Sequence, residues 1–328
     1  MSLQEAIDHL SKGHSLSEKE SEKAFEALVS GDHTEEGKRF LKQLSEKGET
    51  AEELKGLVRV MQKKMRAVTF EEEVLDIVGT GGDGSNSVNI STGAAILAAA
   101  CGALVAKHGN RASSSKCGSA DVLEELGISL EEDPVEALAR AHITFLYAPH
   151  FHPAAKRVAP MRKALGIRTI FNLVGPLLNP ARPTYLLLGV AKESLLDLFA
   201  NVVQTLGVKR SMIVYGNGMD ELTPIGPCQA LLVTPEERKK MTLDPQDFGF
   251  KKCTMKDLEG GDAKTNASIL TAALKGEKGP VADTLILNAG VALFVTERAP
   301  SIESGISFAR HALESGKGFE TLEKWRKR

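Results

Sequence analysis

The residues best suited to chemistry lie in a glycine-rich segment near residue 80. This segment reads GTGGDGSNSVNIST from Gly79 to Thr92 and directly follows a short β-branched run at 74–78. Glycines let backbone N–H groups approach phosphate oxygens closely, and a helix that begins near Ser91 adds N–H groups that favour an anion. A tight turn with an ordinary helix cap is the alternative. Such a turn needs far fewer glycine and polar positions, so we expect a phosphate-binding site.

The same glycines also satisfy the dinucleotide fingerprint G-x-G-x-x-G, which alone is a weak signal. A Rossmann site needs an acidic residue about 20 residues further on to bind the ribose. Residues 94–106 contain no acid, and the next charged residue is Lys107. The chain also lacks the G-x-x-x-x-G-K-[ST] string of a Walker loop. We therefore do not expect nicotinamide, flavin or P-loop nucleotide binding.

A second loop carries basic residues interleaved with small hydroxyl side chains. It reads KHGNRASSSKCGS from Lys107 to Ser119. Basic residues with neighbouring hydroxyls suit a polyanion, whereas a solvated basic loop is the alternative. Further along, the adjacent carboxylates of Asp220 and Glu221 follow an apolar run at 212–215. Two hard oxygen ligands of this kind suit Mg²⁺, although an acidic helix start has the same pattern.

The elements that position these residues alternate between strands and helices. Strands are expected at 74–78, 103–106, 143–148, 185–190, 212–215 and 230–233, and helices at 91–101, 119–126, 134–141 and 193–206. This alternation predicts an α/β domain with a mostly parallel central sheet. In such a sheet both loops leave from the same carboxyl edge, where ligands bind. The last residues, 324–328, are expected to be a frayed basic tail.

The N-terminal part of the chain shows only helical patterns. Capping boxes are expected at Ser17 to Glu20 and at Thr50 to Glu53, each ahead of apolar residues at helical spacing. We therefore expect a small helical domain at 1–70 and an α/β domain at 71–328.

Composition limits the kinds of partner. The 328 residues carry a net charge of −2, with 42% hydrophobic, 26% charged and only 5% aromatic residues. This balance is typical of a globular protein and gives no sign of a nucleic-acid or membrane-surface footprint. The four cysteines include no C-x-x-C pair, and the N-terminus lacks the basic start and apolar core of a signal peptide. We expect a cytoplasmic protein with no nucleic-acid or membrane partner.

The motifs together resemble the anthranilate phosphoribosyltransferases. The resemblance rests on GTGGD at 79–83, NIST at 89–92 and KHGNRASSSKCGSADVLEELG at 107–127. It continues through LGIRTIFNLVGPL at 165–177, NPARP at 179–183, the acidic pair at 220–221 and NAG at 288–290. It therefore covers nearly the whole chain, and the first motifs are specific.

The resemblance implies a nucleoside-phosphorylase-like phosphoribosyltransferase fold and a homodimer. Its helical domain would also take in a mid-chain segment near 160–182. The implied reaction is transfer of 5-phosphoribose from phosphoribosyl pyrophosphate to the amine of anthranilate, with about two Mg²⁺ ions. This is the second step of tryptophan biosynthesis from chorismate.

Carried over by motif, the resemblance also implies the site residues. The donor-binding set would be Gly79, Gly82, Asp83, Ser87, Asn89, Ile90, Ser91, Thr92, Lys107, His108, Gly109, Asn110, Arg111, Ala112, Ser113, Ser114, Ser115 and Ser119. Gly79, Asn110 and Arg162 would hold anthranilate, and Ser91, Asp220 and Glu221 would serve the metal.

An aromatic amine is unprotonated at neutral pH and needs little general-base help. His108 is accordingly only a weak catalytic candidate, with a loop-packing histidine as the alternative. The guanidinium of Arg162, expected near the end of a helix that starts at Pro153, matches a carboxylate geometrically. Two other functions stay open: a nucleoside phosphorylase-like enzyme of the same fold, and a non-enzymatic nucleic-acid-binding paralogue. The first would not need the acidic pair, and the second should show a basic face.

Overall fold

The computed structural model describes residues 1–31, 34–112 and 116–327. The chain divides into two compact units, of which the first comprises Met1–Ala67 and Ala148–Pro180, and the second Val68–Tyr147 and Ala181–Arg328. Within the described ranges, no helix combines the length and the apolar character needed to cross a membrane.

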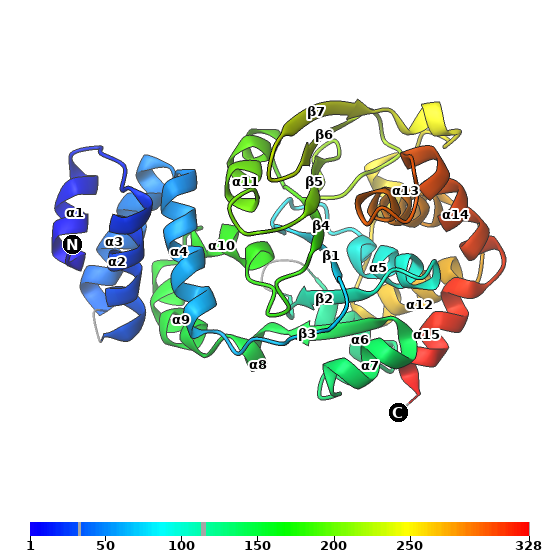
Figure 1. Ribbon diagram of the computed structural model, residues 1–328, viewed down its shortest axis with the longest axis horizontal. Coiled ribbons are helices and arrows are strands. Elements are labelled where there is room, and N and C mark those ends of the chain that lie inside the picture. Colours follow the sequence, from blue (N-terminus) through cyan, green and yellow to red (C-terminus); the bar gives the residue numbers. More distant parts are fainter. Residues whose placement is uncertain (32–33, 113–115, 328) are drawn as a thin grey trace. The chain divides into compact units, whose positions relative to one another are not determined.

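The first unit is built of helices (Figure 1). They are α1 (Leu3–Ser11), α2 (Glu18–Ser30), α3 (Thr34–Lys47), α4 (Ala51–Lys64), α8 (Ala148–Phe151), α9 (Pro153–Leu165), α10 (Phe171–Val174) and the 3-10 turn η1 (Gly175–Leu177).

Two features stabilise this helical unit. The capping boxes expected at Ser17 and Thr50 are confirmed, and each hydroxyl accepts a hydrogen bond from the backbone three residues later. The ring of Phe25 packs edge-on against Phe40, with ring centroids 5.2 Å apart, and against Phe171 at 6.0 Å. The second contact joins α2 to the mid-chain segment, so residues far apart in the sequence form one core.

The second unit contains a seven-stranded sheet with the order β3-β2-β1-β4-β5-β6-β7 (Figure 1). The strands are β1 (Leu75–Gly79), β2 (Val105–Gly109), β3 (Ile143–Tyr147), β4 (Tyr185–Gly189), β5 (Arg210–Tyr215), β6 (Cys228–Val233) and β7 (Arg238–Leu243). The first five strands in this order are parallel, which confirms the expected mostly parallel sheet. The ribbon of β6 and β7 is antiparallel, and β7 was not expected from the sequence.

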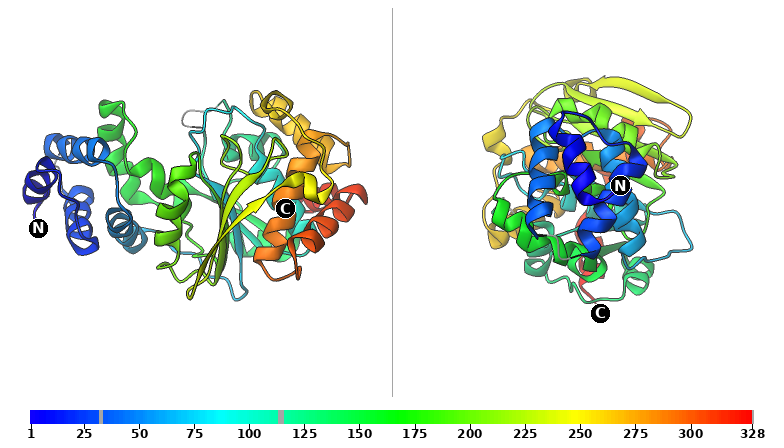
Figure 2. Two further views of the ribbon diagram at one scale, coloured as in Figure 1. Left: turned by 90° about the horizontal axis from the view of Figure 1, so that it is seen from above. Right: turned by 90° about the vertical axis from the view of Figure 1, so that its left-hand side faces the viewer.

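Helices cover both faces of this sheet. They are α5 (Ile90–Ala100), α6 (Ser119–Glu125), α7 (Pro134–Ala141), α11 (Leu196–Val203), α12 (Ala263–Leu274), α13 (Pro280–Val295), α14 (Ile302–Glu314) and α15 (Lys317–Arg326), with 3-10 turns at η2 (Glu193–Leu195), η3 (Pro245–Phe248) and η4 (Met255–Leu258). Alternate strand residues such as Ile77, Leu187 and Met212 are buried in one cluster with α5 and α13. Figure 2 shows α12–α15 gathered on this face, with α11 on the opposite one.

The C-terminal end of the chain is part of the core. Trp325, near the end of α15, is only 2% exposed, and Arg326 Nε donates to the carbonyl of Leu126 at 2.5 Å. The expectation of a frayed basic tail was therefore wrong up to residue 326. A buried indole anchors the last turn, although its flanking residues are basic.

Candidate active site

The candidate site lies where β1 and its neighbours end. In the strand order, β1 lies between β2 and β4. The chain therefore adds β2 and β3 on one side of β1 and the later strands, beginning with β4, on the other side. Ligands of open α/β sheets bind at such a point, beyond the carboxyl ends of the strands. The glycine-rich segment follows β1, the second loop follows β2, and the acidic pair follows β5. The expected convergence of the two loops at one edge is thus confirmed by the strand order.

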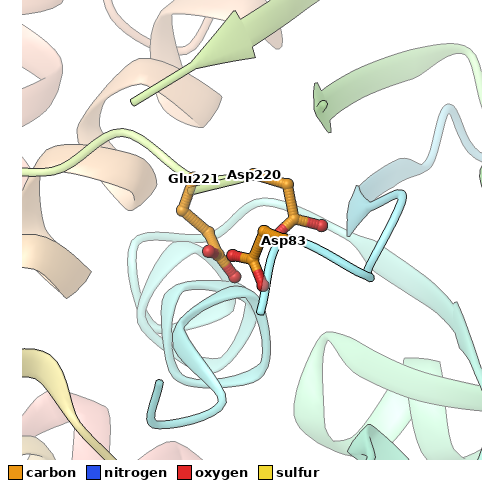
Figure 3. Close-up of side chains that lie close together, drawn as sticks. All are labelled: Asp83, Asp220 and Glu221. Carbon is orange, nitrogen blue, oxygen red and sulfur yellow. The ribbon is translucent and has the colours of Figure 1, made fainter. Parts of the chain in front are cut away.

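Three carboxylates meet at this edge (Figure 3). Asp83 comes from the glycine-rich segment, and Asp220 and Glu221 come from the segment after β5; their ligand atoms all lie within 4.8 Å of one another. We call these three residues the acidic cluster. The sequence places Asp83 in the donor-binding set and not among the metal ligands. No local pattern in the sequence predicts its contact with Asp220 and Glu221, which lie more than 130 positions away.

Paired glycines allow the acidic cluster to form. Gly79 and Gly189 are register partners at the ends of β1 and β4. A Cβ atom on Gly79 would lie 2.2 Å from Asp220 Oδ2, and one on Gly189 would lie 1.5 Å from the Asp220 carbonyl oxygen. Gly81 N–H also donates to Asp220 Oδ2 at 2.6 Å. Only the absence of side chains therefore lets Asp220 approach the strand ends this closely.

The acidic cluster is electrostatically costly in the absence of a cation. Burial, followed by the charge of Asp83, raises the pKa of Asp220 to about 7. Burial and the charges of Asp220 and Asp83 raise the pKa of Glu221 well above its usual value. Among the described residues, the buried atoms Asp83 Oδ2 and Glu221 Oε2 have no hydrogen-bond partner. Buried carboxyl oxygens without a hydrogen-bond partner fit a hard divalent cation such as Mg²⁺, whose charge would favour the ionised form of these acids.

The side chain of Lys107 is buried, with only 2% of its surface exposed, and it interacts electrostatically with Asp220 and Glu221 of the acidic cluster. Its Nζ donates to the Ile77 carbonyl at 2.6 Å and to Ser91 Oγ at 3.2 Å, at the start of α5. Burial lowers the Lys107 pKa, while Asp76, Glu221 and Asp220 raise it. Ser91, for which the resemblance implies a metal role, therefore contacts the buried ammonium of Lys107 through its hydroxyl.

The start of α5 is close to its expected position. The helix begins at Ile90, and the buried hydroxyl Oγ1 of Thr92 has no partner among the described residues. Asn89 links three parts of the site: its Nδ2 donates to the Cys117 carbonyl at 3.2 Å, and its Oδ1 accepts from Asn266 Nδ2 at 2.9 Å. Its side chain therefore joins the glycine-rich segment to the second loop.

The second loop is organised by a residue that sequence reasoning missed. Asp121 Oδ2 accepts from the backbone N–H groups of Ala112 and Gly118, both at 2.9 Å. The guanidinium of Arg111 pairs with Asp121 at 3.1 Å and with Glu124 at 2.5 Å, so it contacts α6. A capping-box spacing from Gly118 was the available signal for Asp121. Ser113, Ser114 and Ser115 lie outside the described residues.

The other predicted donor-binding residues make contacts within the second loop, within the glycine-rich segment and with β1. Ser119 Oγ donates to the Asn110 carbonyl at 3.2 Å, and Gly109 lies so close that a Cβ there would be 2.2 Å from the same hydroxyl. Ser87 Oγ accepts from Ser85 Oγ at 3.3 Å. His108 is 5% exposed, and its backbone N–H donates to Asp76 Oδ1 at 3.2 Å.

Arg162 belongs to the first unit. As expected, it lies near the end of α9, whose cap Gly166 donates its N–H to the Arg162 carbonyl at 3.2 Å. Its guanidinium carbon lies 5.5 Å from the centroid of the Phe171 ring, and burial lowers its pKa. Gly79 and Asn110, the other predicted acceptor residues, belong to the second unit.

Comparison with known proteins gives consistent matches for both units. The model of the glycosyl transferase family, helical bundle domain, matches residues 4–65, and that of the glycosyl transferase family, a/b domain, matches residues 71–319. The anthranilate phosphoribosyltransferase of Chlamydia felis is 42% identical over 327 residues, which cover 98% of this chain and 95% of the relative. That of Methanobrevibacter smithii is also 42% identical, with 98% of each chain covered.

Solved structures agree. Anthranilate phosphoribosyltransferase from Thermus thermophilus matches with a TM-score of 0.91 and 40% identity, covering 98% of both chains. The Saccharomyces cerevisiae enzyme in complex with PRPP and Mg matches with a TM-score of 0.88 and 27% identity, covering 98% of this chain and 96% of that one. With relatives at about 42% identity over 98% of its length, the chain belongs to the anthranilate phosphoribosyltransferase family.

Proposed function

We propose that this protein transfers 5-phosphoribose from phosphoribosyl pyrophosphate to the amine of anthranilate. The products are N-(5-phosphoribosyl)anthranilate and pyrophosphate, in the second step of tryptophan biosynthesis from chorismate. The acidic cluster beside the glycine-rich segment is the observation that carries the proposal. It joins a cation-binding group to a phosphate-binding backbone, which is what a pyrophosphate leaving group requires.

The donor is proposed to bind in the second unit. Loss of pyrophosphate from the anomeric carbon builds negative charge on the leaving group and positive charge on the sugar ring. Asp83, Asp220 and Glu221 would hold Mg²⁺, which when bound neutralises charge on the pyrophosphate. About two ions are proposed, with the Ser91 hydroxyl as a further ligand.

The chain's own groups complete the donor site. The positive end of the α5 helix dipole favours a phosphate there, and the buried Thr92 hydroxyl, which has no partner among the described residues, is available to donate to it. Lys107 also favours a phosphate at this position, because its ammonium donates a hydrogen bond to Ser91 Oγ and adds positive charge. Burial lowers the pKa of Lys107, and the nearby charges of Asp76, Glu221 and Asp220 act against this lowering.

The acceptor needs positioning more than activation. The lone pair of an aromatic amine is free at neutral pH, so a strong base is not needed, and the buried His108 suits a packing role. Arg162 of the first unit is proposed to bind the anthranilate carboxylate.

We also propose that the protein acts in the cytoplasm as a homodimer. This part of the proposal comes from the family resemblance. Analytical ultracentrifugation at two protein concentrations would test the dimer.

One assay tests the reaction. The protein is mixed with Mg²⁺, phosphoribosyl pyrophosphate and anthranilate, and the loss of anthranilate fluorescence is followed. Controls replace the donor with ribose 5-phosphate, or remove the metal with a chelator. We expect fluorescence to fall only in the complete mixture; unchanged fluorescence in that mixture contradicts the proposal.

A further inference from the structure

A buried amide lies in the middle of α13, an otherwise apolar helix. Asn288 is 2% exposed, and its neighbours Leu287 and Ala289 are fully buried. A polar group in such surroundings is costly unless it is hydrogen-bonded. Its amide makes three hydrogen bonds: Oδ1 accepts from Leu222 N–H at 3.1 Å, and Nδ2 donates to the carbonyls of Leu222 at 2.7 Å and Thr284 at 2.9 Å.

Two of these bonds hold the backbone of a single residue. Leu222 directly follows the acidic pair, and its N–H belongs to the same planar peptide unit as the Glu221 carbonyl. Binding both the N–H and the C=O of Leu222 fixes the peptide planes on both sides of that residue. Asn288 therefore determines the direction in which the chain leaves Glu221.

The two acids of the pair are anchored differently. Asp220 is held through its carboxylate by Gly81 N–H at 2.6 Å. Glu221 Oε2, in contrast, is buried and has no partner among the described residues. Mutual repulsion tends to separate carboxylates that lie this close. The position of the Glu221 carboxylate thus depends in part on its backbone, and two of the hydrogen bonds that fix the backbone directly after it come from Asn288.

We propose that Asn288 is a positioning residue for the metal-binding acids. By clamping Leu222, it keeps the Glu221 carboxylate next to Asp220 and Asp83, so that the cluster is formed before a cation arrives. This inference rests on the proposed metal site. Groups that orient metal ligands in this way typically change metal affinity about 10- to 100-fold when they are removed.

A purely structural role predicts something different. If Asn288 only satisfies two buried backbone groups, its loss lowers the thermal stability and leaves the metal dependence unchanged. If it positions Glu221, its loss weakens metal binding while the KM for anthranilate stays the same.

The test compares two variants with a matched control on the same helix. Asn288→Ala removes all three bonds, and Asn288→Ser leaves room for a water molecule to bridge to Leu222 if the alanine variant does not fold. The control is Thr284→Val, which loses a buried hydroxyl that donates to the Pro280 carbonyl at 2.7 Å. This control weakens α13 without touching the acidic pair.

Two quantities are measured: the Mg²⁺ concentration that gives half-maximal transfer, and Mn²⁺ binding to the protein alone by electron paramagnetic resonance. We expect both to weaken at least about tenfold in the Asn288 variants and to stay at the wild-type values in Thr284→Val. Unchanged metal dependence in the folded Asn288 variants, or an equal shift in the control, overturns the inference. If the wild type itself needs no Mg²⁺ and binds no Mn²⁺, the proposed metal site fails and the role of Asn288 fails with it.

Discussion

The carbonyl oxygen of Asp220 occupies the space in which a side chain on Gly189 would begin. A Cβ atom on Gly189 would lie 1.5 Å from that oxygen, far inside any permitted contact. The acidic cluster can therefore form only if β4 ends in glycine.

Gly189→Ala should displace Asp220 and reduce kcat by about 100-fold, because a shift of about 1 Å in a reacting group can cost that much. The control is Gly175→Ala, where nothing lies within 4 Å of the added atom. Steady-state kinetics and circular dichroism separate a lost site from a lost fold. A folded Gly189→Ala variant with wild-type kcat contradicts the close-packing argument.

Asp220→Asn should raise the Mg²⁺ requirement at least about tenfold, yet it should not destabilise the metal-free protein. The folded-state pKa of Asp220, at about 7, is above its ordinary value. The cost to stability is therefore full above about pH 7 and disappears progressively as the pH falls from about 7 to about 4, the ordinary pKa of an aspartate. Thermal melts in chelator at pH 8 should show an equal or higher Tm for Asp220→Asn. A clearly lower Tm means that the carboxylate stabilises the fold.

Lys107→Met should weaken donor binding by about 10- to 150-fold, the usual effect of losing a charged hydrogen bond. Methionine fills nearly the same buried volume but cannot make the hydrogen bonds from Nζ to the Ile77 carbonyl and to Ser91 Oγ. Calorimetric titration of each substrate would check the prediction, with the exposed Lys192→Met as the control. A larger loss for anthranilate than for the donor would refute the assignment.

Arg162→Ala should raise the anthranilate KM and leave donor affinity nearly unchanged. Arg162→Lys should rescue only partly, because a point charge cannot reproduce the bidentate fork. The exposed neighbour Lys163→Ala serves as the control. The proposal for Arg162 is wrong if its alanine variant abolishes donor binding or keeps the wild-type KM.

His152 should make the helical unit sensitive to acid. It is 5% exposed, and burial lowers its pKa to about 4. The unfolded chain takes up this proton below about pH 6.5, whereas the folded protein resists until about pH 4. Stability should therefore fall as the pH drops through this window, by up to about 3 kcal/mol. Denaturant unfolding of His152→Gln should show a flatter pH dependence, whereas the surface variant His14→Gln should behave like the wild type. An equal acid loss in His152→Gln would exclude this histidine as the cause.

Features that depend on neighbours along the chain can be predicted from the amino-acid order alone. Helix starts at Ser17 and Thr50 follow from spacings of three residues. The glycine-rich segment predicts phosphate binding, because the conformational freedom of glycine is a local property of the backbone. Alternating strands and helices were enough to predict a mostly parallel sheet, which places both loops at one edge.

The contacts between residues that are distant in the sequence could not be predicted and are seen only in the folded chain. Asp83 joins Asp220 and Glu221, and Asn288 clamps Leu222 from 66 positions further along the chain. Such contacts depend on strand order, register and helix packing, and no local period in the sequence encodes them. The antiparallel β7 and the buried Trp325 were missed for the same reason: their hydrogen bonds and packing partners come from elsewhere in the fold.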